Sequence, residues 1–235
     1  MRSRANKKVA ISGYYGFKNT GDEAILYSIL ELLRKDKNIE PIVLSNAPEE
    51  TTKLYNVKAA DRWSIGEVSK TLLNSKFLIS GGGSLLQDVT GIKSLLYYLG
   101  VIGLAKFYGK KVIFYAQGIG PITTSMGRRL MKLVCNKVDL ITVRDEASKT
   151  LLEQLGVKKP PIRVTVDPVL GVDYKKIDLE IGRSILKHYN IKDTQPIIGI
   201  SVRDWQDLTE FKKEIAKVCD ILVKKGYQIL FIPFH

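Results

Sequence analysis

The stretch Val9–Leu33, VAISGYYGFKNTGDEAILYSILELL, decides the fold. Its apolar run Val9–Ser12 predicts a strand, and the glycine-rich segment Gly13–Glu23 predicts a turn. A helix is then predicted over Asp22–Arg34. The apolar residues of this helix recur at i, i+3, i+4 and i+7 and form one stripe: Leu26, Ile29, Leu30 and Leu33. A strand, a turn and a helix with one apolar stripe together make a βα unit.

The same alternation continues along the chain. Further strands are predicted at Pro41–Leu44, Phe77–Ser80, Val112–Gln117, Leu140–Val143 and Ile162–Val166. Near-continuous apolar strands such as VIFYA indicate a parallel sheet that is covered on both faces. We therefore expect an α/β fold in which residues 1–168 form a doubly wound, Rossmann-like N-terminal domain.

Asp167-Pro168 breaks the pattern. Residues 169–195 are expected to be a linker, in which the polar stretch Asp173–Asp193 predicts a helix. Residues 196–235 then begin a new cycle, with strand Ile197–Val202, helix Leu208–Lys225 and strand Gln228–Pro233. One βαβ unit is marginal as an independent fold. We expect it to be the beginning of a second, incomplete Rossmann-like domain, in a natural protein longer than 235 residues.

Composition narrows the function classes. The 37 basic and 24 acidic residues give a net charge of +13, which excludes an acidic disordered chain and favours anionic ligands. The two cysteines, Cys135 and Cys219, cannot build a disulfide framework or a CxxC metal site, so a reducing, cytoplasmic setting fits best. No secretion signal is expected. The longest apolar run, Leu95–Ala105, is shorter than the roughly 20 residues of a membrane-spanning helix.

Three predicted strand ends are rich in glycine, and ligands of open α/β sheets bind at the carboxyl ends of strands. The segments are GYYGFKNTGDE after Ser12, GGGSLLQD after Ser80 and GIGP after Gln117. The simpler interpretation is that these glycines only turn the chain. Three such loops on one edge, with polar residues beside them, favour a shared ligand cleft. Its candidate residues are Gly13, Tyr15, Asn19, Gly21, Asp22, Glu23, Gly82, Gly83, Gln87, Asp88, Gln117 and Gly118.

None of these loops carries a nucleotide signature. Gly13, Gly16 and Gly21 have the wrong spacing for GxGxxG, and no Gly-Lys-Ser/Thr follows for a P-loop, which disfavours an NAD enzyme and a P-loop NTPase. No cluster of metal-ligating residues is visible, so no metal is expected.

Two arginines leave strand ends in similar motifs, TVRDEAS and SVRDW. The planar guanidinium groups of Arg144 and Arg203 suit phosphate or carboxylate groups. Asp145 is expected to cap the helix that begins near Glu146 rather than to act in catalysis. His235, at the end of the last predicted strand, is a candidate ligand contact.

The basic residues also show a pattern on two predicted helices. Lys106, Lys110 and Lys111 follow the Leu95–Ala105 run, and Arg128, Arg129 and Lys132 lie on one side of a helix. A basic, aromatic-flanked helix can lie on an anionic membrane, although a core helix with a solvated basic end is the simpler interpretation. Nucleic-acid binding is not expected, because no helix-turn-helix, RNP or zinc pattern accompanies the charge.

Taken together, the motifs ISGYYGFKNTGDEAIL, ISGGGSLLQDVTG, FYAQGIGP, ITVRDEAS, DPV and ISVRDW occur in the same order in the polysaccharide pyruvyltransferase family. The chain resembles its CsaB-type branch, which attaches a pyruvate ketal to a secondary cell-wall polysaccharide used in S-layer anchoring. The resemblance implies a GT-B-like architecture of two Rossmann-like domains. It implies phosphoenolpyruvate as donor and co-substrate, with no other cofactor, and a lipid-linked disaccharide ending in N-acetylmannosamine as acceptor.

By this resemblance the first domain holds the acceptor, through the cleft residues above and Arg144, and the second holds the donor, through Arg203 and His235. Asp22, Glu23 and Asp88 are unranked candidates for a catalytic base. Family members carry an Arg-Leu-His motif and a later lysine further along, and neither occurs in these 235 residues. We therefore expect this chain to bind acceptor without turnover. A lipid-linked acceptor also favours peripheral membrane contact.

Two other functions remain open from the sequence. One is a GT-B glycosyltransferase that uses a nucleotide sugar, and the other is a non-catalytic module that binds a glycolipid.

Overall fold

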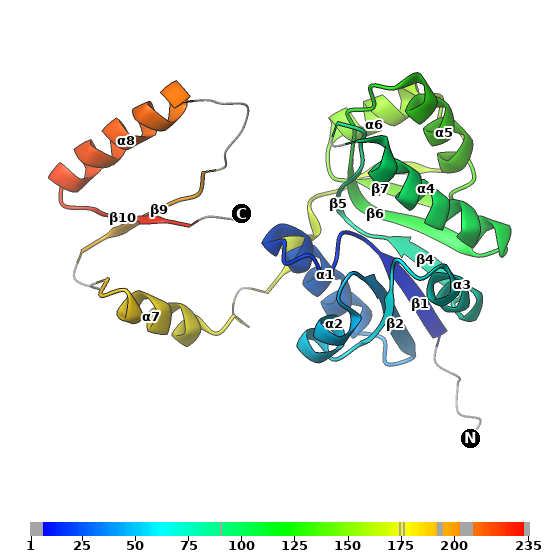
Figure 1. The fold of residues 1–235 in the computed structure, drawn as a ribbon, viewed down its shortest axis with the longest axis horizontal. Helices are drawn as coiled ribbons and strands as arrows, with labels where there is room; N and C mark the ends of the chain where they lie inside the picture. Colours follow the sequence, from blue (N-terminus) through cyan, green and yellow to red (C-terminus); the bar gives the residue numbers. More distant parts are fainter. Residues whose placement is uncertain are drawn as a thin grey trace. The chain divides into compact units, whose positions relative to one another are not determined.

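The computed structural model describes residues 7–89, 91–173, 175, 177–191, 195–202 and 209–232. The chain divides into two compact units, Met1–Val172 and Asp173–His235, which are coloured blue to yellow and yellow to red in Figure 1.

The first unit is built on one parallel sheet. In the order of the sheet, its strands are β3 (Lys58–Asp61), β2 (Ile39–Ser45), β1 (Lys7–Ser12), β4 (Phe77–Ser80), β6 (Lys111–Ile119), β7 (Leu140–Val143) and β8 (Ile162–Val164). A short strand, β5 (Gly83–Leu86), pairs with β6 beyond the end of β4. Ile11 on β1 lies opposite Val43 of β2 and Ile79 of β4.

Helices cover both faces of this sheet (Figure 1). They are α1 (Thr20–Leu33), α2 (Pro48–Tyr55), α3 (Ile65–Asn74), α4 (Ile92–Phe107), α5 (Ser125–Cys135) and α6 (Glu146–Gln154). Val9 and Ile11 pack with the buried side of α1, and Ala10 joins the core formed with α3, α4, α5 and α6. Successive side chains of a strand point to opposite faces, so β1 contributes to the cores on both sides of the sheet. The doubly wound, parallel α/β fold is confirmed.

Several predicted bounds agree with the structure and others differ for identifiable reasons. β4 and β7 have the predicted limits, and the stripe on α1 is buried. α1 begins at Thr20 rather than Asp22, because the side chain of Asn19 caps it. β8 ends at Val164 rather than Val166. β3 and β5 were not predicted from the sequence.

The last part of the first unit is a 3-10 turn, η1 (Pro168–Gly171), which packs against α1 and buries Pro168. The unit therefore includes residues just beyond the boundary at 168 that the sequence predicts.

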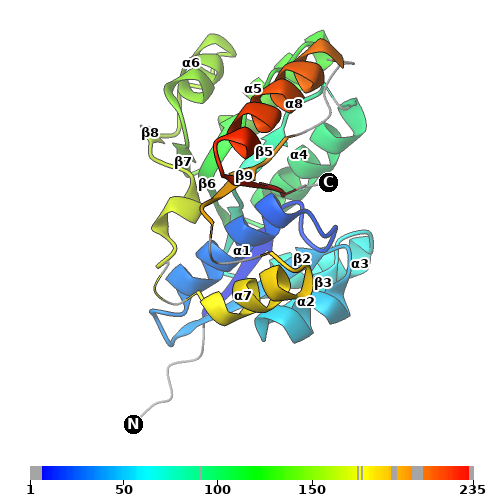
Figure 2. The ribbon, with the colours of Figure 1, turned by 90° about the vertical axis from the view of Figure 1, so that its left-hand side faces the viewer.

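The second unit contains α7 (Leu179–His188), β9 (Ile197–Ile200), α8 (Thr209–Lys224) and β10 (Gln228–Phe231). β9 and β10 pair in parallel and α8 packs on β10, so these three elements form a βαβ unit (Figure 2). The predicted apolar face of α8 is only partly covered, since Cys219 is buried but Val218 is 52% exposed. The predicted helical linker contains α7, on which no residue is buried.

Among the described residues, no helix is long and apolar enough to cross a membrane.

Candidate active site

The predicted cleft residues gather at the carboxyl ends of β1, β4, β6 and β7, which neighbour one another in the sheet. The loop after β1 lies at this edge and is held in place by the side chains of Asn19 and Glu23. Asn19 Oδ1 accepts hydrogen bonds from the backbone N–H groups of Gly21 and Asp22, at 3.1 and 3.2 Å. This cap sets where α1 begins, and therefore where Asp22 and Glu23 lie.

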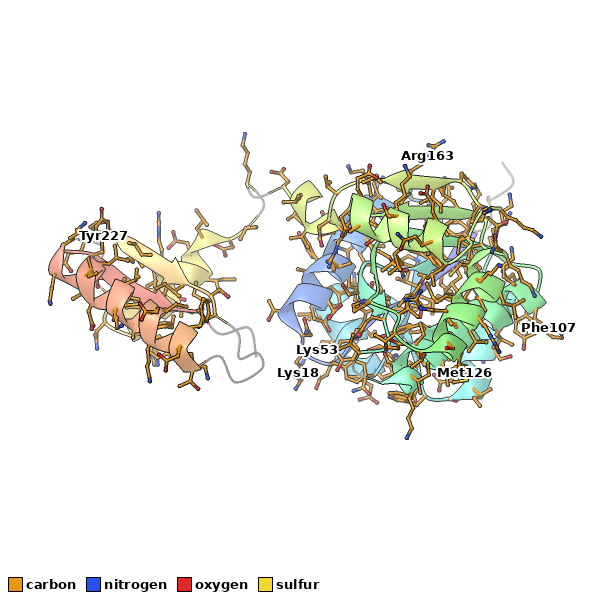
Figure 3. All side chains as sticks on the ribbon, turned by 90° about the horizontal axis from the view of Figure 1, so that it is seen from above. Lys18, Lys53, Phe107, Met126, Arg163 and Tyr227 are labelled. Atoms are coloured by element: carbon orange, nitrogen blue, oxygen red, sulfur yellow. The ribbon has the colours of Figure 1, made fainter. Side chains whose placement is uncertain are left out.

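Glu23 holds the loop in place. Its Oε1 accepts from the backbone N–H of Gly16 at 2.8 Å, and its Oε2 accepts from the Tyr55 hydroxyl at 2.6 Å. The loop continues to Lys18, which is labelled in Figure 3. The Lys18 Nζ lies 3.7 Å from Oε1 of Glu50 on α2. With both carboxylate oxygens bonded to protein groups, Glu23 is suited to a structural role rather than to the role of a base.

Asp88 is held even more completely. Its two carboxylate oxygens accept four hydrogen bonds, from the backbone N–H and the side-chain hydroxyl of both Thr123 and Thr124, at 2.7 to 2.9 Å. Desolvation raises the pKa of Asp88, but these hydrogen bonds outweigh it and lower that pKa to about 2. A carboxylate this stable in its charged form is a poor base.

Asp22 differs from both. Its carboxylate accepts no hydrogen bond from any residue that the structure describes, and Oδ1 lies so near Gly83 that a Cβ on this glycine would be 2.8 Å away. Burial and the neighbouring Glu23 carboxylate raise the pKa of Asp22 to about 6, although the Arg144 guanidinium opposes the shift. A free carboxylate whose pKa lies close to neutrality is suited to general acid–base chemistry.

Arg144 leaves the end of β7 and reaches the same edge. Its guanidinium donates to Ser84 Oγ at 2.9 Å and lies 3.4 Å from Asp167 Oδ2 and 3.7 Å from Asp145 Oδ2. Asp145 also caps α6 by accepting from the Ser148 N–H, as predicted. The Arg144 side chain remains 34% exposed, so part of it can contact a ligand.

The glycines at these strand ends make room for side chains of this protein. A Cβ on Gly13 would lie 2.2 Å from the Tyr15 ring, and one on Gly81 would lie 2.0 Å from the Tyr15 hydroxyl. A Cβ on Gly118 would lie 2.9 Å from the Arg144 guanidinium. Gly82 is enclosed by Ile25, Pro168 and the Tyr115 carbonyl. These close approaches explain the glycine-rich strand ends.

Two buried polar atoms below this edge have no hydrogen-bond partner among the described residues. Gln117 donates through Nε2 to Ser80 Oγ and the Gly81 carbonyl, at 2.7 and 2.8 Å, and leaves its Oε1 without a donor. The Tyr15 hydroxyl, beside Gly81, has no acceptor. Burial, with the nearby Asp22 carboxylate, raises the pKa of Tyr15 well above its usual value. Gln87 turns back to the chain and accepts from the Val89 N–H at 3.0 Å.

Arg62 follows β3 and was not predicted from the sequence. It is only 4% exposed, donates to the Gly13 carbonyl at 2.9 Å, and forms no ion pair with any described carboxylate. Arg62 follows the strand KAAD, which is not one of the glycine-rich strand ends. The sequence does contain one feature that could have identified Arg62, because it directly follows a short strand, as Arg144 does.

The model of the polysaccharide pyruvyl transferase family matches residues 19–235. The chain belongs to the polysaccharide pyruvyl transferase family. No curated protein matches it significantly.

Several solved structures have a fold similar to that of this family member. It is similar to UDP-GlcNAc 2-epimerase from Neisseria meningitidis bound to UDP-GlcNAc, at 18% identity and a TM-score of 0.56, over 97% of this chain and 66% of that chain. It is also similar to HepE from Anabaena in complex with UDP-glucose, at 10% identity and a TM-score of 0.55, over 97% of this chain and 69% of that chain. It is similar to MnaA from S. aureus with UDP as well, at 13% identity and a TM-score of 0.54, over 97% of this chain and 62% of that chain.

These likenesses confirm a GT-B, Rossmann-like fold for this chain. The chain spans between 62% and 69% of the length of these three proteins.

The predicted donor residues Arg203 and His235 lie outside the described residues. Within the described part of the pyruvyl transferase chain, no group of three or more His, Cys, Asp or Glu side chains could hold a metal ion.

Proposed function

We propose that this protein is a ketal pyruvyltransferase of the CsaB type. It transfers the pyruvyl group of phosphoenolpyruvate to an N-acetylmannosamine-type sugar of a lipid-linked cell-wall polysaccharide precursor. The observation that supports this most directly is the Asp22 carboxylate, which accepts no hydrogen bond from the residues that the structure describes and whose pKa is raised to about 6. A ketal needs deprotonation of two sugar hydroxyls, and Asp22 is the carboxylate of the site suited to that step.

The reaction balances as an addition followed by a displacement. Protonation of the methylene carbon of phosphoenolpyruvate leaves a cationic carbon, which a sugar hydroxyl attacks while Asp22 takes its proton. The bond from that carbon to the phosphate oxygen then breaks, and a second hydroxyl of the same sugar attacks the carbon and closes the ketal ring. The proton of this second hydroxyl goes to the departing phosphate, which leaves as hydrogen phosphate. Arg144 contributes positive charge beside Asp22, where it can contact the carboxylate of the pyruvyl group or the departing phosphate.

Arg203 and His235 are proposed to hold phosphoenolpyruvate. The acid that protonates the methylene carbon is proposed to be the histidine of the Arg-Leu-His motif, which these residues do not contain. No metal or cofactor takes part in this proposal.

Phosphate release from phosphoenolpyruvate tests the proposal. The assay uses this chain and a version extended through the second domain, each with a synthetic N-acetylmannosamine-containing lipid-linked disaccharide. We expect acceptor-dependent release by the extended protein alone, lowered about 10²-fold or more by Asp22→Asn and unchanged by Glu153→Gln, a matched change on the exposed side of α6. Turnover unaffected by Asp22→Asn would reject Asp22 as the base.

A GT-B glycosyltransferase is the second candidate, because the similar solved structures carry uridine nucleotides. A nucleotide sugar would then raise the melting temperature of the extended protein and phosphoenolpyruvate would not. Binding of the glycolipid without any phosphate release would instead indicate a non-catalytic module.

A lipid-linked acceptor leads us to propose that α5 docks on an anionic membrane. Arg128, Arg129 and Lys132 are exposed on α5, with Met126 51% and Leu133 58% exposed beside them. Phe107, which Figure 3 labels on the outside of α4, is 83% exposed. Basic and apolar groups on one surface bind anionic lipid interfaces.

Three other residues of the predicted basic and aromatic surface are occupied within the protein. Lys106 pairs with Asp139 at 2.7 Å, Lys110 donates to the Leu73 carbonyl, and Tyr98 is buried. Sedimentation with anionic liposomes should therefore be lost in Arg128→Glu/Arg129→Glu and weakened by salt. Equal binding by this double variant would place the membrane contact elsewhere.

A further inference from the structure

Aromatic rings are exposed on the loop after β1, which leads to Asp22, and on the loop after β3. Tyr14 is 39% exposed and stacks face to face on Phe17, with ring centroids 4.0 Å apart and planes 5° from parallel. Trp63, directly after Arg62, is 60% exposed and tilts against Tyr97 at 5.6 Å. We call Tyr14, Phe17 and Trp63 the aromatic platform.

Arg62 supports this platform from the protein side. Its guanidinium lies 5.0 Å from the Phe17 centroid and 5.1 Å from the Trp63 centroid, and it also contacts the rings of Tyr97 and Tyr98, at 4.2 and 5.4 Å. One buried cation thus holds both loops of the platform through cation–π contacts.

Hydrogen bonds fix the orientation of Trp63 although most of its surface is exposed. The indole Nε1 donates to Asn46 Oδ1 at 2.8 Å, and Asn46 Nδ2 donates to the Gly16 carbonyl at 3.3 Å. The backbone N–H of Trp63 donates to Asp61 Oδ1 at 2.9 Å. A ring held this firmly binds a ligand without the entropic cost of ordering a free side chain.

The platform is continuous with the Asp22 site through one loop. Arg62 donates to the Gly13 carbonyl at the start of this loop, and Asn19 at its end caps the helix that carries Asp22. Tyr14 and Phe17 belong to the same loop. A ligand longer than one sugar ring, bound at Asp22, can therefore extend along the loop to Trp63.

We propose that the aromatic platform is a second sugar subsite, on which a ring of the acceptor next to the pyruvylated sugar stacks against Trp63. The C–H groups on the face of a pyranose carry partial positive charge and match the negative face of an aromatic ring. The polar side chains at the rim, Asn46 and Asp61, suit a hydroxylated ligand better than a lipid tail. This inference rests on the proposed function, because it takes the ligand to be an oligosaccharide acceptor.

Tryptophan fluorescence tests the subsite without turnover. The chain has two tryptophans, Trp63 and Trp205, so Trp205→Phe leaves Trp63 as the only one. We expect a soluble disaccharide of N-acetylmannosamine and N-acetylglucosamine to change the Trp63 emission, and N-acetylmannosamine alone to leave it unchanged. A response to lipid vesicles instead of the disaccharide would overturn the proposal in favour of a lipid contact.

Calorimetry with the same sugars provides the second measurement. Trp63→Ala should weaken disaccharide binding about three- to tenfold, the range for one aromatic contact, and leave monosaccharide binding unchanged. Trp63→Phe should restore most of the affinity, and Leu54→Ala, an exposed change on α2, should have no effect. Unchanged disaccharide affinity in Trp63→Ala would overturn the subsite and leave the pyruvyltransferase proposal intact. Absence of any sugar binding would overturn the subsite, while phosphate release by the extended protein tests the function separately.

Discussion

At the scale of single residues, three carboxylates with the same predicted role have three different environments. Glu23 holds a loop, Asp88 accepts four hydrogen bonds, and Asp22 accepts none from the described residues. The sequence could place all three near one sheet edge, because each follows a predicted strand. It could not rank them, because the ranking depends on Thr123, Thr124 and Tyr55, which come from distant parts of the chain.

The raised pKa of Asp22 predicts a specific dependence of stability on pH. Its folded-state pKa of about 6 exceeds the ordinary value of 3.8, so the folded protein binds this proton more tightly than the unfolded chain. Stability from this group is complete below about pH 4 and is lost as the pH rises through 6. We expect Asp22→Asn to melt higher than the parent protein at pH 7, with the difference vanishing near pH 4.

Melting curves by circular dichroism across pH 4 to 8 measure this difference, with Glu153→Gln as the control. A constant difference at every pH would contradict the assigned pKa of Asp22.

Tyr15 and Gly81 form a pair whose substitutions should not be additive. Gly81→Ala places a methyl group 2.0 Å from the Tyr15 hydroxyl, which should destabilise the protein by about 1–3 kcal/mol through overpacking. Tyr15→Phe removes the clashing oxygen, and that oxygen has no partner among the described residues, so this change alone should be neutral or stabilising. We expect Tyr15→Phe to suppress most of the cost of Gly81→Ala in a double-mutant cycle by urea unfolding. If the changes in unfolding free energy were additive, the added methyl group at position 81 and the Tyr15 hydroxyl would not be in contact.

At the scale of elements, Asp88 connects the end of β5 to the start of α5. Thr124 is the N-cap of α5, and both Thr123 and Thr124 are held by Asp88. Asp88→Ala leaves these donors without their acceptor, which should cost about 2–4 kcal/mol of unfolding free energy at pH 7.

The contribution of Asp88 to stability changes with pH in the opposite direction to that of Asp22. Because the pKa of Asp88 is lowered to about 2, its contribution is present above about pH 4 and is lost as the pH falls toward 2. Urea unfolding at pH 7 and pH 3 should therefore show a smaller cost of Asp88→Ala at pH 3. Thr123→Ser, which keeps the hydroxyl, is the matched control. An equal cost at both values of pH would refute the charge-based account.

The elements also show what local pattern can and cannot predict. β4 and β7 are short apolar runs between clear breaks, and their predicted limits are correct. β3 has the sequence KAAD and lies at the sheet edge, so it lacks the apolar run by which the other strands were recognised. β5 lies inside a glycine-rich stretch that predicts a turn, and it becomes a strand because β6 extends far enough to pair with it. Because β3 was not predicted, Arg62 and Trp63, which directly follow it, were not recognised as residues at a strand end.

At the scale of the whole molecule, the alternation of strands and helices was sufficient to predict the parallel α/β fold. The two units differ in how many of their hydrophobic side chains are buried. In the first, both sheet faces are covered by helices, whereas in the described part of the second only Cys219 is a buried hydrophobic residue. Ile181 and Ile185 of α7 are 62% and 52% exposed. Few buried apolar contacts mean a low free energy of local opening.

Hydrogen exchange should therefore divide the chain at the boundary between the units. We expect backbone amides of β1, β4 and β6 to be strongly protected, and those of β9, α8 and β10 to exchange faster by at least tenfold at the same pH. Mass spectrometry of peptides on either side of Val172 measures this. Equal protection in both units would show that the second is as stable as the first.

Glu23 links residues that are far apart in the sequence. It bonds the Gly16 N–H with one oxygen and the Tyr55 hydroxyl with the other, so the shape of the loop beside Asp22 depends on a side chain from α2. Replacing Tyr55 alone would leave a carboxylate oxygen without its donor. Across the family, substitutions at positions 23 and 55 should therefore occur together, so evolutionary covariation between them would reveal a selective constraint on this loop.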